Sequence, residues 1–293
     1  MTTATKQHSL QFKVSEAGIC TLELEVNRPP VVVLDRDLLE QLNIALDAIQ
    51  RIENLSGLII KSRSNSVFVA GADLSEIDSL DDQGLYSYLA FGTTVFTKIA
   101  NMRCPTVSLI NGAALGGGLE MALHCDSLIV ANKNSKGKSY PIGLPETTLG
   151  LCPGWGGTQL LPAKIDFKEA VESIVSGKPF SSNSMPNGLA EVQVDSPDKL
   201  EKKAIDLLSS KKIIKTPQNA PSLKNIKLLE EVKENCSQSE TACSVFNAIE
   251  AGAKNGFAAG IASEQCELVL LRSTSNARQK LDDFFQRNNS TNG

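Results

Sequence analysis

The sequence predicts an α/β fold with a helical C-terminal part. Short strand-like segments alternate with helical patterns through the first 200 residues, and only helical patterns follow. A polar linker with two prolines separates the two parts at 210–222. Strands joined by helices are typical of a parallel sheet with crossover connections. We therefore expect an α/β core over 1–209 and a helical part over 210–293.

The core elements follow from the spacing of apolar residues. Strict alternation predicts a strand at 19–26, and apolar residues every three to four positions predict a helix at 36–53. The same reasoning predicts the remaining core elements, which are strands at 57–61, 106–110 and 127–131 and helices at 84–100 and 116–125. A polar, basic, turn-rich segment predicts a surface loop at 132–141.

The helical part shows amphipathic spacing. Helices are expected at roughly 222–235, 239–255 and 261–287. Their faces carry small apolar residues and few aromatic ones. We expect these helices to cover one side of the core or to pack against another subunit.

Composition argues against several classes of protein. The 293 residues can bury one large core or two small ones. The net charge of −4 gives no overall attraction to nucleic acid, so no nucleic-acid partner is expected. No apolar run reaches the roughly 18 residues of a membrane span. The first ten residues have neither a secretory nor a transit pattern, so a cytoplasmic location is the expectation.

Cysteine and histidine usage argues against disulfides and metal sites. The seven cysteines are scattered without a C-x-x-C pair, so neither a disulfide framework nor structural zinc is expected. The two histidines, His8 and His124, offer little material for a histidine-based triad or a metal site. We interpret His124 as a packed helix residue, because Met121 and Leu123 share its helix.

Two glutamates stand beside glycine-rich, helix-opening turns. Glu120 lies in INGAALGGGLEMALHCDS, and Glu146 lies in IGLPETTLGLCPGWGGTQ. A lone glutamate is usually a solvated surface charge. Here the small residues beside each carboxyl let the backbone approach a ligand closely. Two carboxyls that face one pocket predict acid–base chemistry.

Two further turns offer backbone amides. FVAGADLSEI places Gly71 and Ala72 between a strand and a helix, and GAALGGGLE opens a helix near Gly117. Two such amides can bind one carbonyl oxygen as an oxyanion hole, where losing one donor typically costs about 3 kcal/mol of barrier. The alternatives are tight packing or a nucleotide-binding loop. Neither the dinucleotide fingerprint nor the P-loop motif occurs in the sequence.

Four segments together resemble the enoyl-CoA hydratase/isomerase (crotonase) superfamily. In chain order they are FVAGADLSEI, CPTVSLINGAALGGGLEMALHCD, IGLPETTLGLCPGWGGTQLLP and NGLAEV. The match spans about residues 10–290. The third segment and the tail RSTSNARQKLDDFFQR are similar to the hydratase halves of multifunctional fatty-acid oxidation proteins. The resemblance implies a crotonase-like core of ββα units.

The resemblance also implies a role for each site residue. It places the oxyanion hole on the backbone N–H groups of Ala72 and Gly117, and the two hydratase acids on Glu120 and Glu146. It implies hydration of 2-enoyl-CoA to 3-hydroxyacyl-CoA in fatty acid β-oxidation, with no metal or other cofactor because CoA arrives with the substrate. Substrate contacts are expected from the small residues beside these turns and from the tryptophan of PGWGG: Ala70, Gly71, Asp73, Gly116 and Trp155.

Several alternatives stay open. An isomerase or an acyl-CoA hydrolase would share the fold, and a CoA-binding scaffold would keep it without turnover. Trp155 either packs in the core or lines the acyl or pantetheine pocket. The basic loop with Lys133, Lys136 and Lys138 either meets the CoA phosphates or is solvated. The family commonly forms trimers, so a homotrimer or a dimer of trimers is expected.

One departure from the family concerns loop shape. A short helix usually precedes the segment that corresponds to NGLAEV, and here that region contains Met185-Pro186. Proline removes a backbone donor and clashes with the preceding turn, so it should break this helix.

Overall fold

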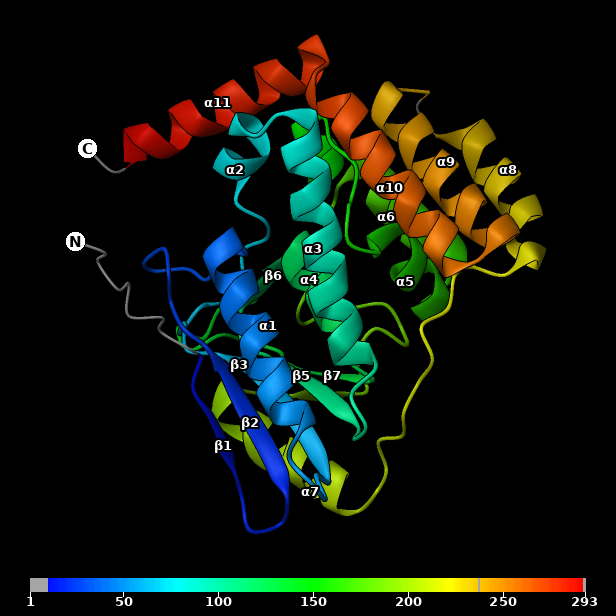
Figure 1. The fold of residues 1–293 in the computed structure, drawn as a ribbon. Helices are drawn as coiled ribbons and strands as arrows, with labels where there is room; N and C mark the ends of the chain where they lie inside the picture. The colour runs from blue at the N-terminus through cyan, green and yellow to red at the C-terminus, as the bar shows by residue number, and fades with distance from the viewer. Residues whose placement is uncertain (1–9, 237, 292–293) are drawn as a thin grey trace.

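Two sheets form the centre of the computed structural model, which describes residues 10–236 and 238–291 (Figure 1). The larger sheet has the strand order β1-β2-β3-β5-β7-β10, and the smaller one has the order β4-β6-β8-β9. The larger sheet consists of β1 (Phe12–Val14), β2 (Ile19–Leu24), β3 (Gly57–Ser62), β5 (Thr106–Ile110), β7 (Ser127–Ala131) and β10 (Val192–Val194). The smaller sheet consists of β4 (Val67–Val69), β6 (Ala113–Leu115), β8 (Pro141–Gly143) and β9 (Phe180–Ser181).

Parallel pairing dominates both sheets. Within the described residues, β1 in the larger sheet and β9 in the smaller sheet pair antiparallel with their neighbours, and the other pairs are parallel. Helices connect most of the parallel strands, as crossover connections require. The predicted α/β class is therefore confirmed.

Alternate residues of the central strands face two separate apolar clusters. Leu58 and Ile60 of β3 belong to the larger core cluster, which contains the buried leucines of α1 (Arg36–Gln50). Ile59 belongs to a second cluster on the opposite face, under α7 (Leu200–Ser209). This is the two-residue period of a strand with both faces covered.

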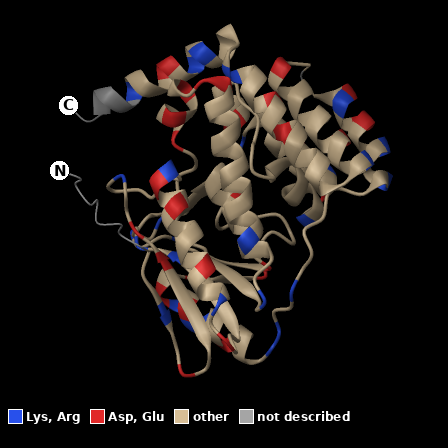
Figure 2. Cartoon of the chain, in the orientation of Figure 1, with Lys and Arg blue, Asp and Glu red and all other residues tan. Residues whose placement is uncertain are grey.

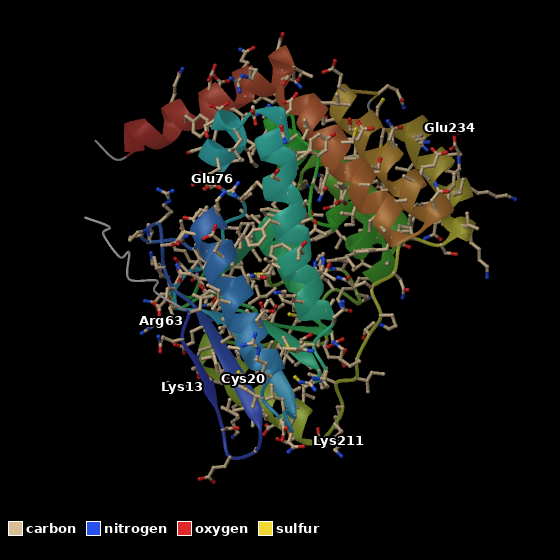
Figure 3. The ribbon with its side chains drawn as sticks, in the orientation of Figure 1. Lys13, Cys20, Arg63, Glu76, Lys211 and Glu234 are labelled. Carbon is tan, nitrogen blue, oxygen red and sulfur yellow. The ribbon has the colours of Figure 1, made fainter. Side chains whose placement is uncertain are left out.

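The N-terminal end of α1 is fixed by two carboxylates. Asp35 caps α1 by accepting the Leu38 amide at 2.8 Å. Glu76, on α2 (Leu74–Ser79), accepts the Arg36 amide at 3.2 Å and lies on the α1 side of α2 (Figure 3). Such caps stabilise a helix by about 1 kcal/mol each. The same helix, α1, also packs on α3 (Asp82–Ala100).

The remaining helices of the core lie around the smaller sheet and after it. They are α4 (Gly117–Leu123), α5 (Gly157–Lys164) and α6 (Phe167–Ser176), together with the short 3-10 turns η1 (Glu146–Leu149) and η2 (Pro197–Lys199). No helix forms between 182 and 190, so the prediction from Met185-Pro186 is confirmed.

Three C-terminal helices pack as a layer against α3, α5 and α6 (Figure 1). They are α8 (Ile226–Asn235), α9 (Glu240–Asn255) and α10 (Phe257–Arg272), preceded by η3 (Leu223–Asn225). The last helix, α11 (Ser275–Thr291), leaves this layer and contacts η1. The prediction of one helix over 261–287 is wrong. The Thr274 hydroxyl accepts the Ala277 amide at 3.2 Å, and this cap starts a new helix in another direction.

The predicted loop at 132–141 is wrong at its C-terminal end. Its lysines are exposed, but Tyr140 is buried, and its hydroxyl donates to the backbone carbonyls of Ile110 at 2.8 Å and Ala131 at 2.5 Å. Pro141 already belongs to β8. The side chain of Tyr140 explains why the loop ends early, because burying its aromatic ring requires a hydrogen-bond partner for its hydroxyl.

Charged residues of both signs are interspersed over the outer elements (Figure 2). In the described part of the chain, each helix is too short or too polar to cross a membrane. The first ten residues were interpreted above as lacking a targeting pattern. Residues 1–9 of this segment lie outside the described residues.

Candidate active site

One cavity of about 820 Å³ is lined by all of the residues to which the sequence analysis gave a catalytic, oxyanion-hole or substrate-binding role. Loops from both sheets, η1 and the C-terminal helices contribute to its wall. The sequence-predicted residues on the wall are Ala70, Gly71, Ala72, Asp73, Gly116, Gly117, Glu120, Glu146 and Trp155. Segments separated by more than 80 positions in the chain therefore meet at one site.

The two amide turns lie against each other. A Cβ added to Gly71 would stand 3.1 Å from the Leu115 carbonyl oxygen and 3.9 Å from the Gly117 nitrogen. Gly71 has a φ of +115° and Gly116 a φ of +53°. Side chains disfavour both conformations, so glycine allows this close approach.

The backbone pairing around the two turns does not use the amides of Ala72 and Gly117. Leu34 pairs with the Gly71 carbonyl at 2.8 Å and with the Asp73 amide at 3.2 Å, and the Ala72 amide lies between these two bonds. Gly117 is the first residue of α4, so its amide has no acceptor within the helix. Both amides can therefore donate to a ligand oxygen.

Glu120 is buried on α4 and is bonded to a distant turn. Its Oε1 accepts the backbone amides of Trp155 and Gly157, both at 2.8 Å. Burial raises the pKa of Glu120 to about 7, against the opposing effect of these amides. A carboxyl with a pKa near neutrality can exchange protons with a substrate.

Glu146 opens η1 and presents its carboxyl to the turn before α4. A Cβ on Gly116 would stand 2.8 Å from Glu146 Oε1. Its Oε2 is buried and has no hydrogen-bond partner among the described residues. Burial, followed by the charge of Glu120, raises the pKa of Glu146 well above its usual value. Such a group favours the protonated form.

A family model described as enoyl-CoA hydratase/isomerase matches residues 15–267 of the chain. The chain belongs to the enoyl-CoA hydratase/isomerase family. The resemblance predicted from the four sequence segments is thus confirmed. Membership in this family is consistent with the two amide turns and two carboxyls on one cavity.

The curated relatives are longer proteins, and this chain matches only a part of each. The chain is 36% identical over 203 residues to the fatty acid oxidation complex subunit alpha of Pseudomonas savastanoi pv. phaseolicola. That alignment covers 68% of this chain and 27% of the relative. The chain therefore spans about a quarter of the length of this relative.

Solved structures of the family share the fold. The enoyl-CoA hydratase from Bacillus anthracis is 27% identical with a TM-score of 0.62, covering 96% of this chain and 97% of that one. The human mitochondrial delta3-delta2-enoyl-CoA isomerase is 22% identical with a TM-score of 0.71, covering 98% of this chain and 100% of that one. The fold thus occurs with both reactions.

The position of Trp155 fits both alternatives raised from the sequence, packing in the core and lining the pocket. Its ring is buried between Tyr88 and Phe96, with centroid distances of 5.4 Å to each, and its Nε1 donates to the Leu89 carbonyl at 2.9 Å. It also lies on the cavity wall. The residue therefore packs in the core and bounds the site.

Asp73 and His124 have structural partners. Asp73 caps α2 by accepting the Ser75 amide at 2.9 Å, and it accepts a hydrogen bond from Arg28 at 2.9 Å. His124 is buried, with Nδ1 2.8 Å from the Glu120 carbonyl oxygen. Burial lowers the pKa of His124 to about 4, so the imidazole is neutral near pH 7. The interpretation of His124 as a packed residue is confirmed.

The sequence analysis missed a third buried carboxyl, Glu264 on α10. It is fully buried and accepts the Gly156 amide at 2.6 Å and the Thr158 amide at 2.7 Å. The available signal was its position three residues after Ile261 and four before Leu268, within the apolar stripe of the helix. A charge in such a stripe indicates a buried partner.

The lysines of the basic loop lie apart from the site. Lys133, Lys136 and Lys138 are exposed, and none of them belongs to the described residues that line the cavity. This placement favours the solvated-loop alternative.

Proposed function

We propose that this protein hydrates 2-enoyl-CoA thioesters to 3-hydroxyacyl-CoA in fatty acid β-oxidation. The observation that carries the proposal is that Glu120 and Glu146 line the same cavity as Ala72 and Gly117, whose amides the surrounding backbone pairing does not use. An isomerase needs one acid–base group to move a double bond. Hydration needs a group for the attacking water and one for the C2 proton, and this site offers two.

The oxyanion hole supplies the charge stabilisation. The Ala72 and Gly117 amides donate to the thioester oxygen, which becomes enolate-like as water adds to C3. Donors placed in advance at a buried site are worth more than donors in water, and each is typically worth about 3 kcal/mol of barrier. The dipole of α4 adds to the effect at Gly117.

The two glutamates divide the proton transfers. Glu120 takes a proton from water while the water oxygen bonds to C3, and Glu146 gives a proton to C2 as the double bond is lost. The amides on Glu120 favour its ionised form, and the burial of Glu146 favours its protonated form. Proton return from Glu120 to Glu146 through solvent completes the cycle.

The substrate brings the coenzyme with it, so no cofactor takes part in these steps. Part of the cavity wall is apolar, with Leu89, Leu268 and Phe285 among its residues. Apolar wall suits the acyl chain, because contact with it removes apolar surface from water.

The test is the loss of conjugated enoyl-thioester absorbance with crotonyl-CoA and with a medium-chain 2-enoyl-CoA. We expect turnover by the wild type and a loss of about 10²- to 10⁴-fold in both Glu120→Gln and Glu146→Gln. Loss in Glu146→Gln alone points to the isomerase. No turnover by folded wild type refutes the proposal, and tight thioester binding without turnover then supports a scaffold.

A further inference from the structure

Two carboxylates share the amides of one turn. The backbone N–H groups of Trp155, Gly156, Gly157 and Thr158 donate in alternation, the first and third to Glu120 and the second and fourth to Glu264. The Thr158 hydroxyl also donates to Glu264 at 2.5 Å. Glu120 approaches from α4 and Glu264 from α10, so the turn is held between two helices.

The next residue fastens the same turn to α9 and α10. The Gln159 side chain is fully buried, and its Nε2 donates to the Ala248 carbonyl at 2.9 Å and to the Thr158 hydroxyl at 2.7 Å. A Cβ on Gly252 of α9 or on Gly260 of α10 would overlap the Gln159 amide. The two glycines thus form a slot between the helices that this side chain fills.

Two glycines stand in the turn where it enters α5. Gly156 has a φ of +104° and Gly157 is the first residue of α5, so neither residue restricts the backbone through a side chain. The direction of the amides on Glu120 therefore depends also on what binds the alternating amides. Glu264 binds both of these.

We propose that Glu264 is a positioning residue, which holds the Gly156 and Thr158 amides so that the Trp155 and Gly157 amides stay directed at Glu120. The inference rests on the proposed function, in which Glu120 is the base. It makes the C-terminal helix α10 part of the catalytic machinery, although Glu264 itself does not line the cavity.

The direction in which the pKa of Glu120 shifts distinguishes a positioning role of Glu264 from a purely electrostatic one. If the turn relaxes, Glu120 loses two donors that favour its ionised form, and its pKa rises. Burial, followed by the charge of Glu120, raises the pKa of Glu264 well above its usual value, so the two carboxyls oppose each other's ionisation. If only this repulsion matters, replacing the Glu264 carboxyl lowers the pKa of Glu120. The other titratable groups near Glu264 are Glu146 on η1, Cys152 before α5 and the neutral His124 on α4.

The test compares Glu264→Gln with Glu267→Gln. Glutamine keeps one acceptor oxygen and turns an NH₂ group toward one of the amides, so the turn loses an anchor. Glu267 is one helical turn further along α10, and its carboxylate accepts the Ser244 hydroxyl at 2.7 Å and the Asn247 amide at 2.9 Å on α9. It provides the matched control, because it is a hydrogen-bonded carboxylate on the same helix that does not touch the turn.

The readouts are hydration kinetics and the pH titration of tryptophan fluorescence. Trp155 is the single tryptophan of the chain, and its amide is bonded to Glu120, so its emission reports on that carboxyl. We expect a wild-type midpoint near pH 7 that is absent in Glu120→Gln. In Glu264→Gln we expect kcat to fall about 10-fold or more at nearly constant KM, and the midpoint to move to higher pH. Glu267→Gln should change neither.

An unchanged kcat, or a midpoint that moves to lower pH, overturns the inference. If Glu264→Gln does not fold by circular dichroism, Glu264→Asp decides, because it keeps the charge and withdraws the carboxylate by one carbon. Positioning then predicts a lower kcat and a higher midpoint, and wild-type behaviour overturns it. If the wild type does not hydrate enoyl thioesters, the proposed function fails, and the fluorescence midpoint alone tests the inference.

Discussion

The indole ring of Trp155 packs against the backbone of Gly117. A Cβ added to Gly117 would stand 2.5 Å from Cζ3 of the ring. The amide of Gly117 is the proposed oxyanion donor, and the amide of Trp155 is bonded to Glu120. The contact between Trp155 and Gly117 therefore connects the proposed oxyanion donor with the turn that binds Glu120, the proposed base.

Gly117→Ala should damage this contact. The added methyl group has no room, so either the ring or the turn must move, at a cost of about 1 to 3 kcal/mol of stability. Displacement of the amide should lower kcat about 100-fold, which steady-state kinetics and thermal denaturation will measure. Gly137→Ala is the control for activity, since nothing lies within 4 Å of its added Cβ, although the φ of +71° at this position makes alanine strained there. Full activity in Gly117→Ala would contradict the role of this amide.

The rate of hydration should depend on pH through the two glutamates. Glu120 must be ionised to act as base, so kcat/KM should fall as pH decreases through its pKa of about 7. Glu146 must be protonated, so a second fall is expected at higher pH. The measurement is kcat/KM against pH. A profile without an acid limb would contradict the assignment of Glu120.

The free energy of unfolding should decrease as pH increases because of Glu120, whereas a carboxylate in an ion pair stabilises the fold more as pH increases. The pKa of Glu120 rises from 4.5 to about 7 on folding, so between these values the folded state holds more protons and loses stability as pH increases. Glu120→Gln should therefore be more stable than the wild type at pH 8, by on the order of 3 kcal/mol, and equally stable near pH 4.5. Urea unfolding at both pH values tests this. A difference that does not depend on pH would contradict it.

Arg272 should contribute strongly to the junction of α2, α3 and α10. Its side chain is 8% exposed, donates to the Ile77 carbonyl at 3.2 Å and to the Leu80 carbonyl, and pairs with Asp82. Arg272→Met leaves buried carbonyl groups without donors, so we expect a loss of about 2 to 4 kcal/mol in urea unfolding.

Lys254→Met is the matched control for Arg272→Met. It removes a surface ion pair with Glu250, in which the lysine side chain is 51% exposed. Such pairs contribute about 0 to 1 kcal/mol. Equal losses in the two variants would show that burial of Arg272 has no special effect.

The helical part is also expected to form the oligomer interface, as a homotrimer or a dimer of trimers. Leu270 on α10 is 63% exposed, and an exposed leucine is a candidate for burial in an interface. Leu270→Asp should shift the sedimentation coefficient toward a smaller species. Ile214→Asp, in the linker and 73% exposed, should not. A monomeric wild type at working concentration would contradict this expectation.

Much of the site was predictable because its signals are local. Glycines before α4 and the proline before Glu146 mark turns whatever the rest of the chain does, and the residues beside them reached the cavity wall. One error arose where contacts with other elements decide the outcome, because the buried Tyr140 hydroxyl donates to carbonyls on β5 and β7. The other was a local signal that the analysis missed, because Thr274 caps a new helix directly after α10.

The sequence by itself determined the fold class, the central strands of the larger sheet, the two carboxyls and the amide turns, since each depends on a few neighbouring residues. The strands of the smaller sheet, of two or three residues each, are too short for their spacing to predict. Only the tertiary structure decided which groups meet. Glu264 binds the turn at Gly156 across 108 positions, and Gln159 fills the slot between Gly252 and Gly260. Contacts at such separations are selected by packing and by the need of buried polar groups for partners, and no local pattern specifies them.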